Sequence, residues 1–189
     1  IMPSLVGSEM CIRDRCKELF EKSHGRSEGD WFRWRSKTII EFLREVKDLT
    51  VVPLSVSLSP DPLGLYKRFG VDLPSIERNV EFFVIPLYDL TYKVTYLLEA
   101  ITYDFLQITK IPIFIELYAA EPEPKDLLRA ILAIIKFSIK GVILYDPSFT
   151  KIPLLKKEIL ENKEITKKLN RIKNQRFNQI IEKIKALPL

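Results

Sequence analysis

Two apolar segments of the sequence each carry one carboxylate at a position where a buried strand is predicted. Residues 79–86 (NVEFFVIP) include Glu81, and residues 113–119 (IFIELYA) include Glu116. A charge in a buried strand is costly unless it is paired or binds a cation. Two acids on neighbouring strands can hold a divalent metal ion. The alternative is that both acids lie at strand ends or pair with a Lys or Arg, because structural ion pairs are commoner than active sites.

The elements that would position these acids alternate between helices and strands. Apolar spacing and turn residues predict a helix over 30–48 capped by Asp30, a strand over 51–58 and a short helix over 63–69 that Gly70 ends. The same signals then predict a strand over 79–86, a helix over 89–109 capped by Asp89, a strand over 112–120, a helix over 125–139, a strand over 142–145 and helices from 153 onward.

This order predicts an α/β (α+β) fold, with a mixed sheet of three to four strands and helices packed on it. The strands over 79–86 and 112–120 are apolar at nearly every position. Because such strands are buried on both faces, we expect these two to be adjacent and central in the sheet. The helix over 90–109 is expected to connect them.

Composition is that of an ordinary globular protein, and the excess positive charge is local. The chain has 189 residues, of which 47% are hydrophobic and 29% charged, which suggests one domain with or without an appendage. The formal net charge is +5, yet residues 151–189 alone hold 11 Lys and Arg against 4 Asp and Glu. We therefore expect a domain over 16–150 followed by a basic amphipathic helical tail over 151–189.

The cysteine and histidine content and the length of the apolar segments indicate the cellular setting of the protein. Cys11 and Cys16 have only His24 as a further candidate ligand, so neither a zinc site nor a disulfide framework is indicated. A reducing, cytoplasmic setting is then the default expectation. Because the sequence has no run of about 18 or more apolar residues, no membrane span and no membrane partner are predicted.

The first 15 residues call for separate treatment. Residues 1–15 (IMPSLVGSEMCIRDR) resemble a translated sequencing-adapter read, a string that recurs in front of unrelated metagenomic proteins. We expect this segment to be non-native and leave it out of the fold prediction.

Several strings in the second half resemble the minimal nucleotidyltransferases of the DNA polymerase-β superfamily. Residues 111–119 (IPIFIELYA) look like the third strand of that family, and residues 140–146 (KGVILYD) look like its closing turn before the final helices. The resemblance covers roughly residues 36–155. It implies a nucleotidyltransferase-like fold and, in an active member, nucleotide transfer that depends on Mg²⁺.

The family's catalytic motifs are altered in this chain. A Gly-Ser pair would bind nucleotide phosphates at a helix N-terminus, but its position reads Leu58-Ser59, and Gly64 is the nearest glycine. Pro60 and Pro62 follow and remove amide donors. The Asp-x-Asp motif that would hold two magnesium ions reads Asn79-Val80-Glu81, and Glu116 falls at the third acid. The resemblance therefore implies Asn79, Glu81 and Glu116 as metal ligands and Ser59 and Gly64 as nucleotide contacts, in a degenerate site.

Two other patterns have a binding interpretation and a packing interpretation. Residues 31–35 (WFRWR) interleave aromatic rings with cations, which suits base stacking and phosphate contact. In the packing alternative the rings cover the sheet and the cations stay solvated. The basic tail could likewise lie on nucleic acid or an acidic partner, or pack its apolar stripe on the domain. The residues concerned are Trp31, Arg33, Trp34 and Arg35, with Lys167, Lys168 and Arg171 in the tail.

Four tyrosines lie on or near one predicted helix. Tyr92, Tyr96 and Tyr103 share a face of the helix expected over 89–109, and Tyr88 precedes it. Such a stripe is more often packing or a partner surface than a cofactor site.

Three functions remain open from the sequence. The preferred hypothesis is a catalytically degenerate nucleotidyltransferase-fold protein that acts as an interaction or regulatory module, for example the antitoxin-like half of a two-protein system with a partner encoded nearby. The second is an active nucleotidyltransferase with Asn79, Glu81 and Glu116 around Mg²⁺. The third is a nucleic-acid-binding α/β domain that uses the basic tail.

Overall fold

The computed structural model describes residues 15–22, 27–88, 90–147, 153–155, 157 and 161. The chain divides into two compact units, which interleave in sequence. The first unit comprises residues 1–51 and 63–79, and the second comprises residues 52–62 and 80–189. The segment 63–79 thus belongs to the first unit, although it lies in sequence between the two stretches of the second. The predicted segment 1–15 (apart from Arg15) and nearly all of the tail 151–189 lie outside the described residues.

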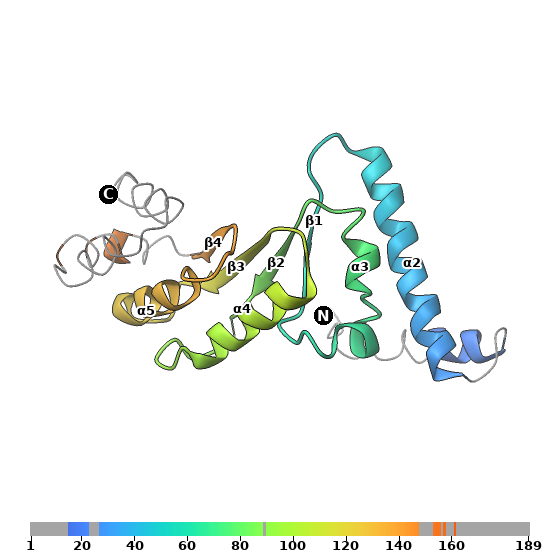
Figure 1. Ribbon diagram of the computed structural model, residues 1–189, viewed down its shortest axis with the longest axis horizontal. Helices are drawn as coiled ribbons and strands as arrows, with labels where there is room; N and C mark the ends of the chain where they lie inside the picture. Colours follow the sequence, from blue (N-terminus) through green and yellow to red (C-terminus); the bar gives the residue numbers. More distant parts are fainter. Residues whose placement is uncertain are drawn as a thin grey trace, which may run out of the picture. The chain divides into compact units, whose positions relative to one another are not determined.

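The first unit is helical throughout its described elements (Figure 1). After a helix over 15–22, it contains α2 (Glu28–Leu49), a π-helix (Leu65–Phe69) and α3 (Leu73–Ile76). The N-cap of α2 is Ser27, whose hydroxyl accepts a hydrogen bond from the backbone N–H of Asp30 at 3.4 Å. The predicted cap at Asp30 was therefore wrong, because a side chain three residues earlier already satisfies that amide.

Gly70 ends the short helix, as predicted. It adopts a left-handed conformation with φ of 71°, and its amide donates to the Tyr66 carbonyl at 2.9 Å. A Cβ atom here would come within 2.8 Å of the Arg35 Cβ. Glycine is required both by the backbone conformation and by the close approach of α2.

The second unit is built on a four-stranded sheet in the order β1-β2-β3-β4 (Figure 1). The strands are β1 (Ser55–Ser57), β2 (Phe82–Pro86), β3 (Ile113–Tyr118) and β4 (Gly141–Tyr145). β2 and β3 are adjacent and central, which confirms the prediction for these segments. The described pairings are all parallel, so the predicted mixed sheet was wrong in this respect. The connections from β2 to β3 and from β3 to β4 each contain one helix, as crossovers between parallel strands usually do.

The two crossover helices of the second unit lie side by side on one side of the sheet (Figure 1). They are α4 (Tyr96–Ile108), between β2 and β3, and α5 (Pro124–Ile134), between β3 and β4. Crossovers between parallel strands are almost always right-handed, so successive steps across the sheet in one direction place their helices on the same face. None of the helices in the described part of the chain is long and apolar enough to cross a membrane.

The helix α4 begins later than the sequence suggested. It was expected from Asp89, which lies outside the described residues, but its first residue is Tyr96. The preceding segment is held in a non-helical path by Tyr92, whose hydroxyl donates to the Leu87 carbonyl at 3.1 Å and accepts from the Tyr118 amide at 2.8 Å. Tertiary hydrogen bonds here outweigh the helical periodicity of the sequence.

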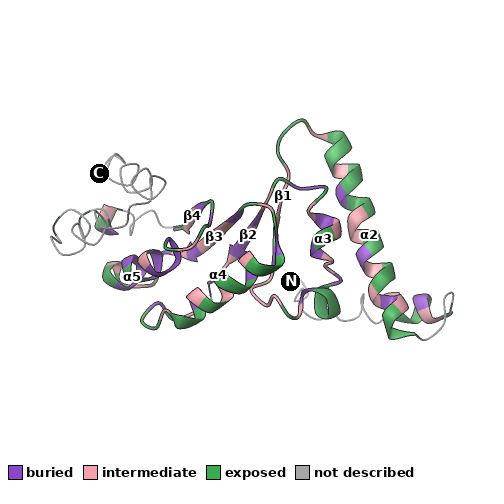
Figure 2. Cartoon of the chain, in the orientation of Figure 1, coloured by how far each residue is buried: buried purple, intermediate pink, exposed green. Residues whose placement is uncertain are grey.

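The core of the second unit lies between the sheet and these helices. The strand residues facing it are at most 1% exposed, and they are Phe83, Ile85, Ile113, Ile115 and Leu117. Seven residues of α5 are buried, six of them apolar, whereas α4 buries only three and exposes most of the rest (Figure 2). The alternate positions of β2 and β3 are half-buried, so the two faces of the sheet differ in their packing.

Candidate functional site

The two strand carboxylates lie toward opposite ends of the sheet. In the β2–β3 register Phe83 pairs with Ile113, so Glu81 is level with residue 111, five residues before Glu116. At about 3.3 Å per residue, the two positions are roughly 16 Å apart along the strand direction. The structure therefore does not bring Glu81 and Glu116 together, because parallel strands place early and late residues at different ends.

Each carboxylate has a local environment that explains how it is accommodated. Glu81 precedes β2, its side chain is exposed, and its amide donates to the Leu54 carbonyl at 2.8 Å. Glu116 is half-buried on the less packed face of β3. Its carboxylate accepts a hydrogen bond from the Tyr88 hydroxyl, and it forms no ion pair with a Lys or Arg among the described residues.

Asn79 has a structural role at the end of the first unit. It is 7% exposed, and its side-chain amide donates to the Ser75 carbonyl at 3.2 Å, one turn back in α3. The described residues contain no group of three or more His, Cys, Asp and Glu side chains that could hold a metal ion. Glu81 and Glu116 therefore belong to no such group, and Asn79 lies in the other compact unit.

The two candidate nucleotide contacts belong to different compact units. Ser59 follows β1 in the second unit and is half-buried beside Pro60. Gly64 lies in the first unit at the start of the π-helix, and its carbonyl accepts from the Arg68 amide at 2.8 Å. A phosphate-binding loop requires a position at the N-terminus of a long helix, and neither residue occupies such a position.

The aromatic and basic residues of α2 pack against one another. Trp31 and Trp34 stack with ring centroids 5.4 Å apart, and Phe20 packs on both. The Arg35 guanidinium lies 5.6 Å from the Trp31 ring centroid and donates to the Arg68 carbonyl, while exposed Arg33 pairs with Asp30. These contacts lie within the first unit, whereas the packing alternative placed the rings on the sheet, which belongs to the second unit. The tail residues Lys167, Lys168 and Arg171 lie outside the described residues.

A tyrosine cluster at the carboxyl end of the sheet forms a site that the motif search missed. Tyr88 follows β2, Tyr118 ends β3 and Tyr145 ends β4. Their ring centroids are 5.7 to 6.0 Å apart, and Tyr88 stacks on Tyr145. We call these three residues the tyrosine edge. Burial, the hydrogen bond to Glu116 and the Glu116 charge all raise the pKa of Tyr88.

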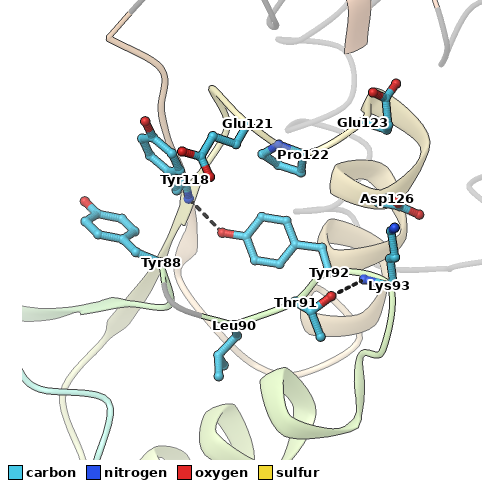
Figure 3. A pocket seen from close by; sticks show the side chains of 10 residues that line it. All are labelled: Tyr88, Leu90, Thr91, Tyr92, Lys93, Tyr118, Glu121, Pro122, Glu123 and Asp126. Carbon is cyan, nitrogen blue, oxygen red and sulfur yellow. Dashed lines mark hydrogen bonds between the residues drawn. The ribbon is translucent and has the colours of Figure 1, made fainter.

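A cavity of about 290 Å³ opens beside the tyrosine edge (Figure 3). Its walls come from the segment after β2, from the end of β3 and from the first turn of α5. They are formed by Tyr88, Leu90, Thr91, Tyr92, Lys93, Tyr118, Glu121, Pro122, Glu123 and Asp126. Open α/β sheets bind ligands outside the carboxyl ends of their strands, and that rule is the sequence-level signal that could have pointed here.

Tyr92 fixes the floor of the cavity. Its two hydrogen bonds tie the residue after β2 to the end of β3, and Figure 3 shows its ring between Thr91 and the Tyr118 amide. Burial raises the pKa of Tyr92 to about 12, and the hydrogen bond from the Tyr118 amide opposes that rise. At neutral pH the phenol is protonated and holds both strands in place.

Asp126 is the buried acid of the site. Its side chain is 6% exposed and pairs with Arg129 one turn later in α5, at 2.9 Å. Arg129 also donates to the Lys93 carbonyl at 3.4 Å, which connects α5 to the segment before α4.

Comparison with protein-family models, with curated proteins and with solved structures gave no match.

Proposed function

We propose that the chain is an interaction or regulatory module with a degenerate nucleotidyltransferase-like site, and that the tyrosine edge is its contact surface. The observation that carries the proposal is the exposure of that edge: Tyr88 is 38% and Tyr145 47% exposed. Tyrosine is enriched at protein interfaces because it offers a rigid apolar ring together with a polar hydroxyl.

The position of the acids supports an interaction role over Mg²⁺-dependent transfer. A two-metal site needs carboxylates that converge on ions about 4 Å apart, whereas the sheet register separates Glu81 from Glu116 by roughly 16 Å. Glu116 instead serves the tyrosine edge, since it accepts the hydrogen bond that orients Tyr88.

A partner encoded by the adjacent gene gives the direct test. The chain is co-expressed with that gene product, and the complex is measured by size-exclusion chromatography and titration. We expect a complex that Tyr145→Ala weakens at least tenfold, because exposed tyrosines are typical interface hot spots. Tyr103→Ala is the matched control, since Tyr103 is 52% exposed on α4, away from the tyrosine edge.

Three outcomes would overturn the proposal. The first is a complex that Tyr145→Ala and Tyr103→Ala weaken equally, and the second is the absence of any complex. The third is nucleotide transfer from ATP that disappears in both Glu81→Gln and Glu116→Gln, which would make the chain an enzyme.

A further inference from the structure

The cavity beside the tyrosine edge has a rigid frame. Tyr92 bridges the ends of β2 and β3 through two hydrogen bonds, and Pro122 restricts the segment between β3 and α5. Sites held by a rigid scaffold lose little entropy when a ligand enters. A volume of about 290 Å³ is at the small end for ligand pockets and suits one side-chain-sized group.

The walls combine aromatic rings with carboxylates. Three tyrosines line the cavity, and Figure 3 shows the Glu121 side chain beside Tyr118 on the rim, next to Pro122. Three of the ten wall residues are acidic and only Lys93 is basic. Asp126 is neutralised by Arg129, whereas Glu121 and Glu123 are exposed and form no ion pair with any described residue.

This combination favours one class of ligand. A cation is attracted both by carboxylates and by the faces of aromatic rings. A guanidinium group also stacks on tyrosine and binds a carboxylate through two parallel hydrogen bonds, which an ammonium group cannot do. We infer that the cavity binds a guanidinium group carried on an apolar stem. The inference does not require the tyrosine edge to contact a protein.

The acids of the cavity also have a structural alternative. Glu123 and Asp126 lie at the start of α5, where negative charges stabilise a helix without any ligand. Glu121 precedes the helix by three residues and has no such role. It is therefore the residue whose substitution separates ligand binding from helix stability.

The experiment titrates the full chain with butylguanidinium and follows the backbone amide resonances of Tyr92 and Tyr118. Butylurea is the neutral control of the same shape. We expect saturable shifts with butylguanidinium only. Glu121→Gln should weaken binding about tenfold, the usual loss for a hydrogen bond between charged groups. Glu41→Gln, which removes an exposed acid from α2, should leave the affinity unchanged.

Two further titrations identify the source of the guanidinium group. Blocked arginine amide is compared with butylguanidinium, and blocked citrulline amide is its neutral control. Tighter binding of the arginine amide assigns the site to an arginine side chain of a polypeptide, and equal binding assigns it to a free small cation. Equal shifts with butylurea, no shifts at all, or equal effects of Glu121→Gln and Glu41→Gln would overturn the inference. Unchanged amide spectra of both unliganded variants away from the substituted residues would confirm that they are folded.

Discussion

The two faces of the sheet in the second unit differ in packing and in chemistry. The face toward α4 and α5 carries aliphatic and phenylalanine side chains that are almost completely buried, such as Ile85 and Ile115. The other face carries half-buried residues, including Glu116, Ile143 and Tyr118, and ends in the tyrosine edge. The first face therefore supplies stability, and the second holds the polar groups that can take part in binding.

The difference between the two faces explains why a carboxylate is tolerated in β3. Glu116 occupies an alternate position of the strand, so its side chain points away from the buried core. Its partner is the Tyr88 hydroxyl, which satisfies an acceptor without a second charge. Glu116, which is unusual in an apolar segment, therefore lies on the sheet face where burying a polar group costs the least free energy.

The largest difference between the faces should appear on truncating one isoleucine on each. Ile115 is 0% exposed, and Ile115→Ala should lower the free energy of unfolding by about 2–5 kcal/mol, because it removes buried methylene groups and leaves a cavity. Ile143, opposite Glu116 in the β3–β4 register, is half-buried. Ile143→Ala should cost about 1 kcal/mol. Urea denaturation of both variants makes the measurement, and equal losses would contradict the assignment of faces.

A smaller difference is expected between two tyrosine hydroxyls. Tyr92→Phe removes the donor to Leu87 and the acceptor for the Tyr118 amide, and leaving two backbone groups without partners should cost about 1–3 kcal/mol. Tyr88→Phe removes a half-exposed hydrogen bond to Glu116 and should cost about 1 kcal/mol or less. Thermal unfolding distinguishes them. A larger loss for Tyr88→Phe would show that the tyrosine edge, and not the Tyr92 bridge, holds the strands together.

The strands and their neighbours could be predicted from the sequence because their signal is local. The runs around Phe83 and Ile115 are apolar at almost every position, and β4 begins one residue before its predicted start, at Gly141. A Cβ there would approach the Phe114 ring to 3.0 Å, a contact that no sequence pattern reveals. The all-parallel sheet, the late start of α4 and the separation of Glu81 from Glu116 were not foreseeable, because the strand register and the Tyr92 hydrogen bonds join residues distant in sequence.

The subtlest contrast concerns the ionisation of the tyrosine edge. The pKa of Tyr88 is raised by burial and by the Glu116 hydrogen bond and charge, and the pKa of Tyr92 is raised by burial to about 12. In the unfolded chain both phenols would ionise near pH 10, so stability is present in full below that pH and is lost as pH rises toward the folded-state pKa values. Glu116→Gln removes a negative charge beside Tyr88 and should lower the pKa of Tyr88 while leaving Tyr92 unchanged. Spectrophotometric titration of tyrosinate should therefore show one phenol of the variant ionising earlier, and stability should fall less steeply above pH 10. Superimposable titration curves of the wild type and the variant would mean that Glu116 does not contact Tyr88 in solution. The less packed face would then lack the polar pair that we assign to it.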